Sequence, residues 1–161
     1  MPMTKNKQTD EQLQEASNHL HYEFWMLMSM AEALSSGIAE KGWLANALLE
    51  SFLIHFRAIC DFFYPNNTQS DDVLAEHFVS NSNEWNSKTR PPLSKNLEDA
   101  RKRAHKELAH ITYTRNTVIS DKKSWPVMEI VYELKELMKI FQENALKNRL
   151  SSKWNAFENK N

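Results

Sequence analysis

Residues 43–63, WLANALLESFLIHFRAICDFF, form the longest apolar run of the chain and indicate its fold class. Along this run a stripe of apolar side chains recurs at three- and four-residue steps: Ala45, Leu49, Phe52, Phe56, Ile59 and Phe63. That spacing places the stripe on one face of a helix with 3.6 residues per turn. Four ionisable residues interrupt the run, Glu50, His55, Arg57 and Asp61, so it predicts a buried helix of a globular protein and not a membrane span.

The same pattern continues on both sides of this helix. Residues 10–36 carry an apolar stripe that begins at Leu13, and Ser94 caps a basic helix with its own stripe: Leu97, Ala100, Ala104, Leu108 and Ile111. A last helix is predicted to begin near Val127, after Ser124, Trp125 and Pro126, and it carries apolar residues to Ala145. Between the long helices, Ser70 is expected to cap a short helix over 71–79, and residues 80–93 are expected to be a loop that Trp85 anchors.

These stretches predict an all-α protein, an antiparallel up-and-down bundle of four long helices plus one short helix. With only two glycines, the chain favours long helices over tight turns. Its 161 residues suit a single domain over 1–161, in which 1–9 and 151–161 are predicted to be flexible tails.

Several side chains carry a structural expectation. His19 and Glu23 are one helical turn apart and predict a surface pair, as do Arg57 and Asp61. His55 is expected to be a core histidine bonded to a hydroxyl or a backbone carbonyl. A set of aromatic residues is predicted to fill the bundle core: Trp25, Trp43, Phe52, Phe56, Phe62, Phe63, Trp85 and Phe141.

The charges are distributed unevenly along the chain. The formal net charge is −1, yet residues 1–87 carry 4 Lys or Arg against 12 Asp or Glu, whereas residues 88–115 carry 8 against 3. One helix and its approach are therefore basic on an acidic body. Such a patch either receives phosphates or complements the acidic helices, within the fold or across a dimer.

The most informative motif for function lies in the basic stretch 101–115, RKRAHKELAHITYTR. Arg103 and His110 are seven residues apart, so on a helix they share a face at a separation of roughly 10.5 Å along the axis. Glu107 lies between them. These three side chains suit a phosphodiester substrate, because His110 could move a proton, Arg103 hold the anion and Glu107 orient the imidazole.

This arrangement resembles the HEPN superfamily (higher eukaryotes and prokaryotes nucleotide-binding domains), helical bundles that bear an Arg, four to six intervening residues and a His. Here six residues separate Arg103 from His110. The resemblance implies a homodimer that brings two Arg/His pairs together in a cleft. It also implies RNA cleavage without a metal, in toxin or defence systems, with Arg103 and His110 as the site.

Other cations and one aromatic residue of the stretch would then contact the nucleic acid. Arg101, Lys102 and Lys106 are predicted to bind its backbone. Tyr113 and Arg115 would stack on or clamp a base, or else end the helix against a neighbouring element.

A metal site is the rival chemical hypothesis. Glu107 and His110 form a Glu-x-x-His turn like those of ferritin-like di-iron bundles, but those bundles need a second such turn and this chain has none. The sequence also lacks a Gly-rich phosphate loop, a Cys/His zinc spacing and a nucleophile elbow. We therefore predict no metal and no cofactor.

Compartment and partners follow from the same composition. The single Cys60 excludes an internal disulfide and suits a packed, reduced thiol, and the N-terminus is polar, so a cytoplasmic protein is predicted. Two functional hypotheses remain open. One is a HEPN-like ribonuclease or RNA-binding protein, and the other is a non-catalytic bundle that dimerises or docks a protein partner.

Overall fold

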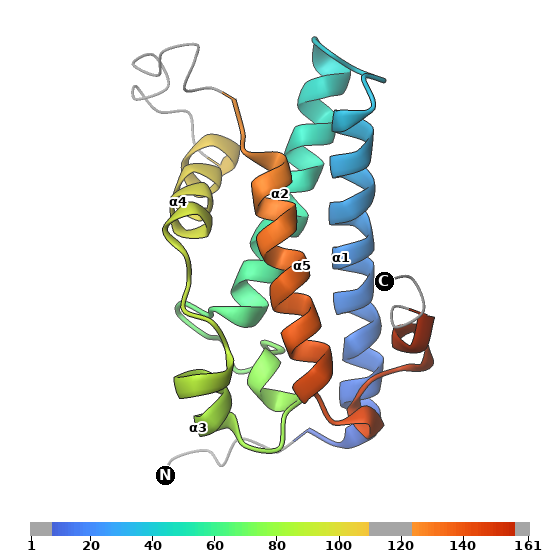
Figure 1. The fold of residues 1–161 in the computed structure, drawn as a ribbon, viewed down its shortest axis with the longest axis vertical. Coiled ribbons are helices and arrows are strands. Elements are labelled where there is room, and N and C mark those ends of the chain that lie inside the picture. Colours follow the sequence, from blue (N-terminus) through green and yellow to red (C-terminus); the bar gives the residue numbers. More distant parts are fainter. Residues whose placement is uncertain (1–7, 110–123, 157–161) are drawn as a thin grey trace.

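The computed structural model describes residues 8–109 and 124–156, and in these ranges the protein is all-α, as predicted. The longer helices of these ranges are α1 (Asp10–Ser35), α2 (Trp43–Phe63), α4 (Lys95–Ala109) and α5 (Val127–Asn144) (Figure 1). Short helical turns connect and follow them: η1 (Ala75–His77), α3 (Ser82–Glu84), η2 (Trp85–Thr89), η5 (Lys147–Arg149) and η6 (Ser152–Ala156). None of the described helices is long and apolar enough to cross a membrane.

The first two helices begin and end almost where the sequence predicts. A capping box begins α1, because the Thr9 side chain accepts a hydrogen bond from the Gln12 backbone while the Gln12 side chain accepts one from the Thr9 backbone. At the turn into α2, Gly37 and Gly42 have φ values of 75° and 87°, which only glycine adopts readily. The two helices lie side by side in Figure 1.

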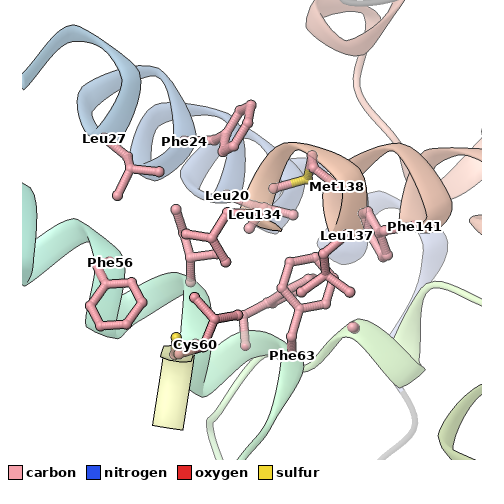
Figure 2. Packing of buried hydrophobic residues seen from close by; sticks show 14 of the residues in the cluster. Leu20, Phe24, Leu27, Phe56, Cys60, Phe63, Leu134, Leu137, Met138 and Phe141 are labelled. Atoms are coloured by element: carbon pink, nitrogen blue, oxygen red, sulfur yellow. The ribbon is translucent and has the colours of Figure 1, made fainter. Parts of the chain in front are cut away.

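The core lies where α1, α2 and α5 meet. Figure 2 shows buried side chains from all three helices in one cluster, among them Leu27 of α1, Phe63 of α2 and Leu134 of α5. The aromatic rings of the core meet edge to face, as in the Phe63–Phe141 pair at 5.6 Å. The stripes predicted for these three helices therefore do form one continuous core.

The segment between α2 and α4 differs from its predicted form. In place of a helix over 71–79, only the 3₁₀ turn Ala75–His77 forms, because Asp72 accepts a hydrogen bond from the Gln69 backbone in a local turn. The predicted loop contains α3, which Asn81 caps, and the π-helical turn η2. Trp85 is 2% exposed and anchors this segment in the core, as expected.

The predicted burial of two tryptophans is wrong. Trp25 and Trp43 are 54% and 80% exposed, because both lie off the apolar stripes of their helices. The other aromatic residues of the predicted set are buried.

The predicted local pairs are also replaced. Glu23 pairs with His55 on α2, with Nδ1 and Oε2 2.6 Å apart, so the partner of the buried histidine is a carboxylate and not a hydroxyl or a carbonyl. Asp61 accepts from Arg101 of α4 in place of Arg57. Contacts between helices thus replace those predicted one turn apart.

The C-terminal segment is ordered over its first six residues, in contrast to the flexible tail expected from Ser151. Trp154 is buried, donates from Nε1 to the Ser17 carbonyl at 3.1 Å and meets the His21 ring edge to face. Burial, together with the nearby Lys153, lowers the pKa of His21. Residues 1–7 and 157–161 of the predicted tails lie outside the described ranges.

Candidate nucleic-acid interface

The basic helix α4 is positioned by its N-cap and its apolar stripe. The Ser94 hydroxyl accepts a hydrogen bond from the Leu97 backbone at 3.1 Å, as predicted for an N-cap. Leu97, Ala100 and Ala104 are buried against the core. This orientation leaves two polar strips on α4, one on each side of the stripe.

One strip of α4 borders a groove of about 810 Å³. This groove, called the basic groove below, lies among the C-terminal half of α2, the segment that follows α2, η2 and α4. Its basic side chains come from α2, from the residue that follows η2 and from α4: Arg57, Arg90, Arg101, Lys102, His105 and Lys106. Three of the five predicted nucleic-acid-binding residues, Arg101, Lys102 and Lys106, therefore meet at one site.

Arg101 is held at the floor of the groove. It donates to the Asp61 carboxylate and, from Nη1, to the Tyr64 carbonyl at 2.8 Å, and its side chain is 15% exposed. These bonds join α4 to the end of α2, so Arg101 is fixed before any ligand binds.

The two lysines of the groove are more accessible. The Lys102 ammonium lies 2.6 Å from the Glu98 carboxylate one turn earlier, and this hydrogen bond lowers the pKa of Glu98. The Lys102 side chain is 64% exposed, so this pair is a surface pair that a phosphate can displace at little cost. Lys106 is also exposed and lies one turn further along α4.

The wall of the basic groove opposite α4 contains a stacked pair of side chains that the sequence does not predict. The Arg90 guanidinium lies 4.8 Å from the centre of the Tyr64 ring and donates to the Phe63 carbonyl. The Tyr64 hydroxyl donates to the Pro91 carbonyl at 2.9 Å, and burial raises the pKa of Tyr64 to about 12. This stack fixes the wall of the groove.

The predicted catalytic set lies on a different strip of α4. Arg103 Nε donates to Glu107 Oε1 at 2.6 Å, so two of the three predicted residues are in contact. Neither lines the basic groove. Arg103 also donates from Nη1 to the Ser124 carbonyl at 2.8 Å and lies 4.0 Å above the Trp125 ring, beside the start of α5.

Arg103 thus has a structural part to play. Its contacts with Ser124 and Trp125 tie α4 to the residues that precede α5, and its side chain is half-buried. His110, Tyr113 and Arg115 lie outside the described residues, so the geometry of the full catalytic set stays a prediction.

Sequence reasoning missed the wall of the groove opposite α4. Besides Arg57 and Arg90, it contains three amides and a carboxylate that come from separate segments: Asn66, Asn67, Glu76 and Asn86. Asn67 has a φ of 52°, in the left-handed region that Asn tolerates. No sequence spacing relates these residues, and only the Asn-Asn dipeptide after Pro65 hinted at a turn.

The structure offers one observation on metals. Over residues 8–109 and 124–156, no group of three or more His, Cys, Asp or Glu side chains is placed to hold an ion. The Glu107–His110 turn of the metal hypothesis extends beyond these ranges.

Comparison of the chain with protein-family models, with curated proteins and with solved structures finds no match. The HEPN resemblance therefore stays a prediction that rests on Arg103, His110 and the helical architecture.

Proposed function

We propose that this protein is a HEPN-like RNA-binding protein, built on an antiparallel bundle of four long helices, and that RNA binds in the basic groove. One observation carries this proposal: Arg101, Lys102 and Lys106 converge with Arg57 and His105 on a single cavity. Cations clustered along one groove are the electrostatic pattern that receives a phosphate backbone.

The charges of the groove suit a short single-stranded segment better than a long duplex. Arg101 is already paired with Asp61, and Lys102 with Glu98, so the cations are not a uniform stripe. The exposed lysines provide the adjustable contacts, whereas Arg101 provides a fixed one. A ligand with one or two phosphates beside uncharged groups matches this mixture.

Replacing Lys102 and Lys106 together by alanine is expected to weaken binding of a labelled single-stranded RNA roughly tenfold at ~0.1 M salt. Because two phosphate contacts are lost, the slope of log Kd against log salt should decrease by about 1.4. Fluorescence polarisation over a salt series measures both quantities. Lys135→Ala with Lys139→Ala is the matched control, since both residues are exposed on α5 and outside the groove.

If the control and the groove variants lose affinity equally, RNA binds through overall charge and the proposed interface is wrong. Thermal unfolding of each variant shows that the fold is retained. Both groove lysines are exposed, so their removal should change stability by less than about 0.5 kcal/mol.

A second candidate function, metal-independent RNA cleavage, is favoured by the contact between Arg103 and Glu107. In this mechanism His110 transfers the proton, Arg103 binds the phosphate and Glu107 orients the histidine. Arg103→Ala is a poor test, because it would also remove the contact with Trp125.

His110→Ala is the informative variant for cleavage. With RNA in excess chelator, we expect the wild type to produce fragments and the variant to lose at least about a hundredfold in rate, because a general base or acid supplies about that factor. RNA that stays intact with both proteins would contradict catalysis. A variant that cleaves at the wild-type rate would exclude His110 from the site.

The non-catalytic alternative has its own support in the exposed tryptophans. Trp25 and Trp43 present large apolar surfaces outside the core, as residues of a dimer or partner interface do. If the wild type neither binds nor cleaves RNA, this is the function that the structure favours.

A further inference from the structure

The two ends of the basic groove differ in chemistry. At the α4 end lie Lys102, His105 and Lys106, with Arg57 across from them on α2. At the other end lie three amides and one carboxylate: Asn66, Asn67, Asn86 and Glu76. Asp61 and Glu98 also line the α4 side, each paired with a cation, so this side keeps a net positive charge, whereas the other segments contribute amides and one carboxylate.

The second end is unsuited to a phosphate. Arg90, a cation of the same wall, is bound to the Phe63 carbonyl and stacked on the Tyr64 ring. Glu76 adds a negative charge that would repel an anion. Amides and a carboxylate instead provide the hydrogen-bonding groups that recognise the edge of a nucleobase.

Glu76 is oriented by a neighbour from a separate segment. The Asn86 amide on η2 donates to Oε2 of Glu76 on η1. Within the described residues this is the one hydrogen-bond partner of the Glu76 side chain, so Oε1 and a lone pair of Oε2 can accept from a ligand. A carboxylate whose two oxygens can both accept hydrogen bonds favours a ligand with two adjacent hydrogen-bond donors.

We propose that this end of the groove, called the base subsite below, binds an unpaired guanine of single-stranded RNA. Guanine alone among the four bases presents two adjacent donors, N1–H and the N2 amino group, to the two oxygens of one carboxylate. The Asn66 and Asn67 amides supply donors for its carbonyl, and Leu93 and Pro65 provide apolar surface for its ring. This inference rests on the proposed RNA binding, since the cations at the α4 end would hold the adjacent phosphate.

The volume of the groove allows both ends to be occupied at once. About 810 Å³ is within the range of sites that enclose a small-molecule ligand, and the base and its phosphate are covalently joined. In a duplex the N1–H and N2 groups are paired with cytosine, so only an unpaired guanine can reach Glu76.

The test compares labelled oligoribonucleotides of equal length. The probes are a uridine octamer and the same octamer with two central guanosines or two central adenosines, all measured by fluorescence polarisation at one salt concentration. We expect the wild type to bind the guanosine probe about fivefold more tightly, or better, than the other two. Glu76→Gln should reduce this ratio to about one. Annealing the guanosine probe to its complement should also abolish the preference.

Glu129→Gln on α5 is the control, because it removes the same charge from an exposed site away from the groove. It should retain the guanosine preference. The side-chain amide introduced by Glu76→Gln would keep an oxygen for the Asn86 amide, and equal melting temperatures would confirm an intact fold. Three results would overturn the base subsite and leave the proposed RNA binding standing. They are binding of all probes by the wild type without a base preference, a guanosine preference that persists in Glu76→Gln, and a guanosine preference that persists in the duplex. Absence of binding to all three probes overturns the proposed RNA binding itself.

Discussion

Replacing Phe141 by alanine is expected to lower the free energy of unfolding by about 3–5 kcal/mol, a large part of the ~5–15 kcal/mol that stabilises a typical domain. Phe141 is fully buried, and its ring meets those of Phe63, Phe78 and Trp154 at centroid distances of 5.6, 5.7 and 6.3 Å. It therefore joins α5 to α2 (Figure 2), and also to the segment after η1 and to the C-terminal turn. Its loss creates a cavity that three separate elements border.

Thermal or urea unfolding followed by circular dichroism measures this effect. A loss of 3–5 kcal/mol corresponds to a melting temperature lower by roughly 6–20 °C for a chain of this size. Trp43→Ala is the matched control: it removes a larger aromatic side chain, but one that is 80% exposed, and should change stability by less than about 0.5 kcal/mol. Equal losses in the two variants would contradict the assignment of Phe141 to the centre of the core. If Phe141→Ala does not fold, Phe141→Leu should fold with a smaller loss of stability.

The long helices could be predicted because their signal is local and repeated. The stripe from Leu13 to Ala31 and the stripe from Phe52 to Phe63 each extend over several turns, so a single exception does not alter the period. The burial of Trp85 could be predicted because a large apolar side chain in a polar segment is stabilised by packing into the core.

The burial of individual aromatic side chains could not be read from residue type. Trp25 and Trp43 are as apolar as Phe56, but they lie off the stripes and remain at the surface. Position on the helix thus decides burial more strongly than side-chain hydrophobicity does.

The pairing of polar side chains was also beyond sequence spacing. Glu23 has a histidine one turn away on its own helix, but it contacts His55, which lies 32 residues away. Asp61 likewise accepts a hydrogen bond from Arg101 on α4 and not from Arg57 on its own helix. Ion pairs between residues one turn apart on the same helix stabilise it only weakly. A pair with a residue on a facing helix is partly buried, and its electrostatic interaction is therefore stronger.

The residues of the candidate site also fall into those that the sequence predicts and those that it does not. Arg101, Lys102 and Lys106 could be chosen from sequence because they cluster on one helix. Arg57, Glu76 and the amides of the opposite wall come from segments that only folding brings together. The role of Arg103 was hidden for a related reason, because Trp125, its stacking partner, lies far along the chain.

The second large effect is expected at Cys60. This thiol is fully buried on α2, and burial raises its pKa to about 12 (Figure 2). At pH 8 the thiolate fraction is then about one in ten thousand, whereas an exposed cysteine with a pKa near 8.5 is about a quarter ionised. Ionisation alone therefore slows the reaction with a thiol reagent by more than about a thousandfold, and exclusion of the reagent slows it further.

The native protein should accordingly show no rapidly reacting thiol with a chromogenic disulfide reagent at pH 8, and one thiol after denaturation. Ala47→Cys supplies an internal standard, because Ala47 is exposed on the same helix, away from the core. This variant should release one equivalent of chromophore at once and the second only as the protein unfolds, so that the slow rate reports the opening of α2. Rapid reaction of a full equivalent in the wild type would show that Cys60 is accessible, and the packing of α2 against α1 and α5 would then be wrong. Because Phe141 and Cys60 belong to the same core, the slow reaction should also accelerate in Phe141→Ala, whereas Trp43→Ala should leave it unchanged.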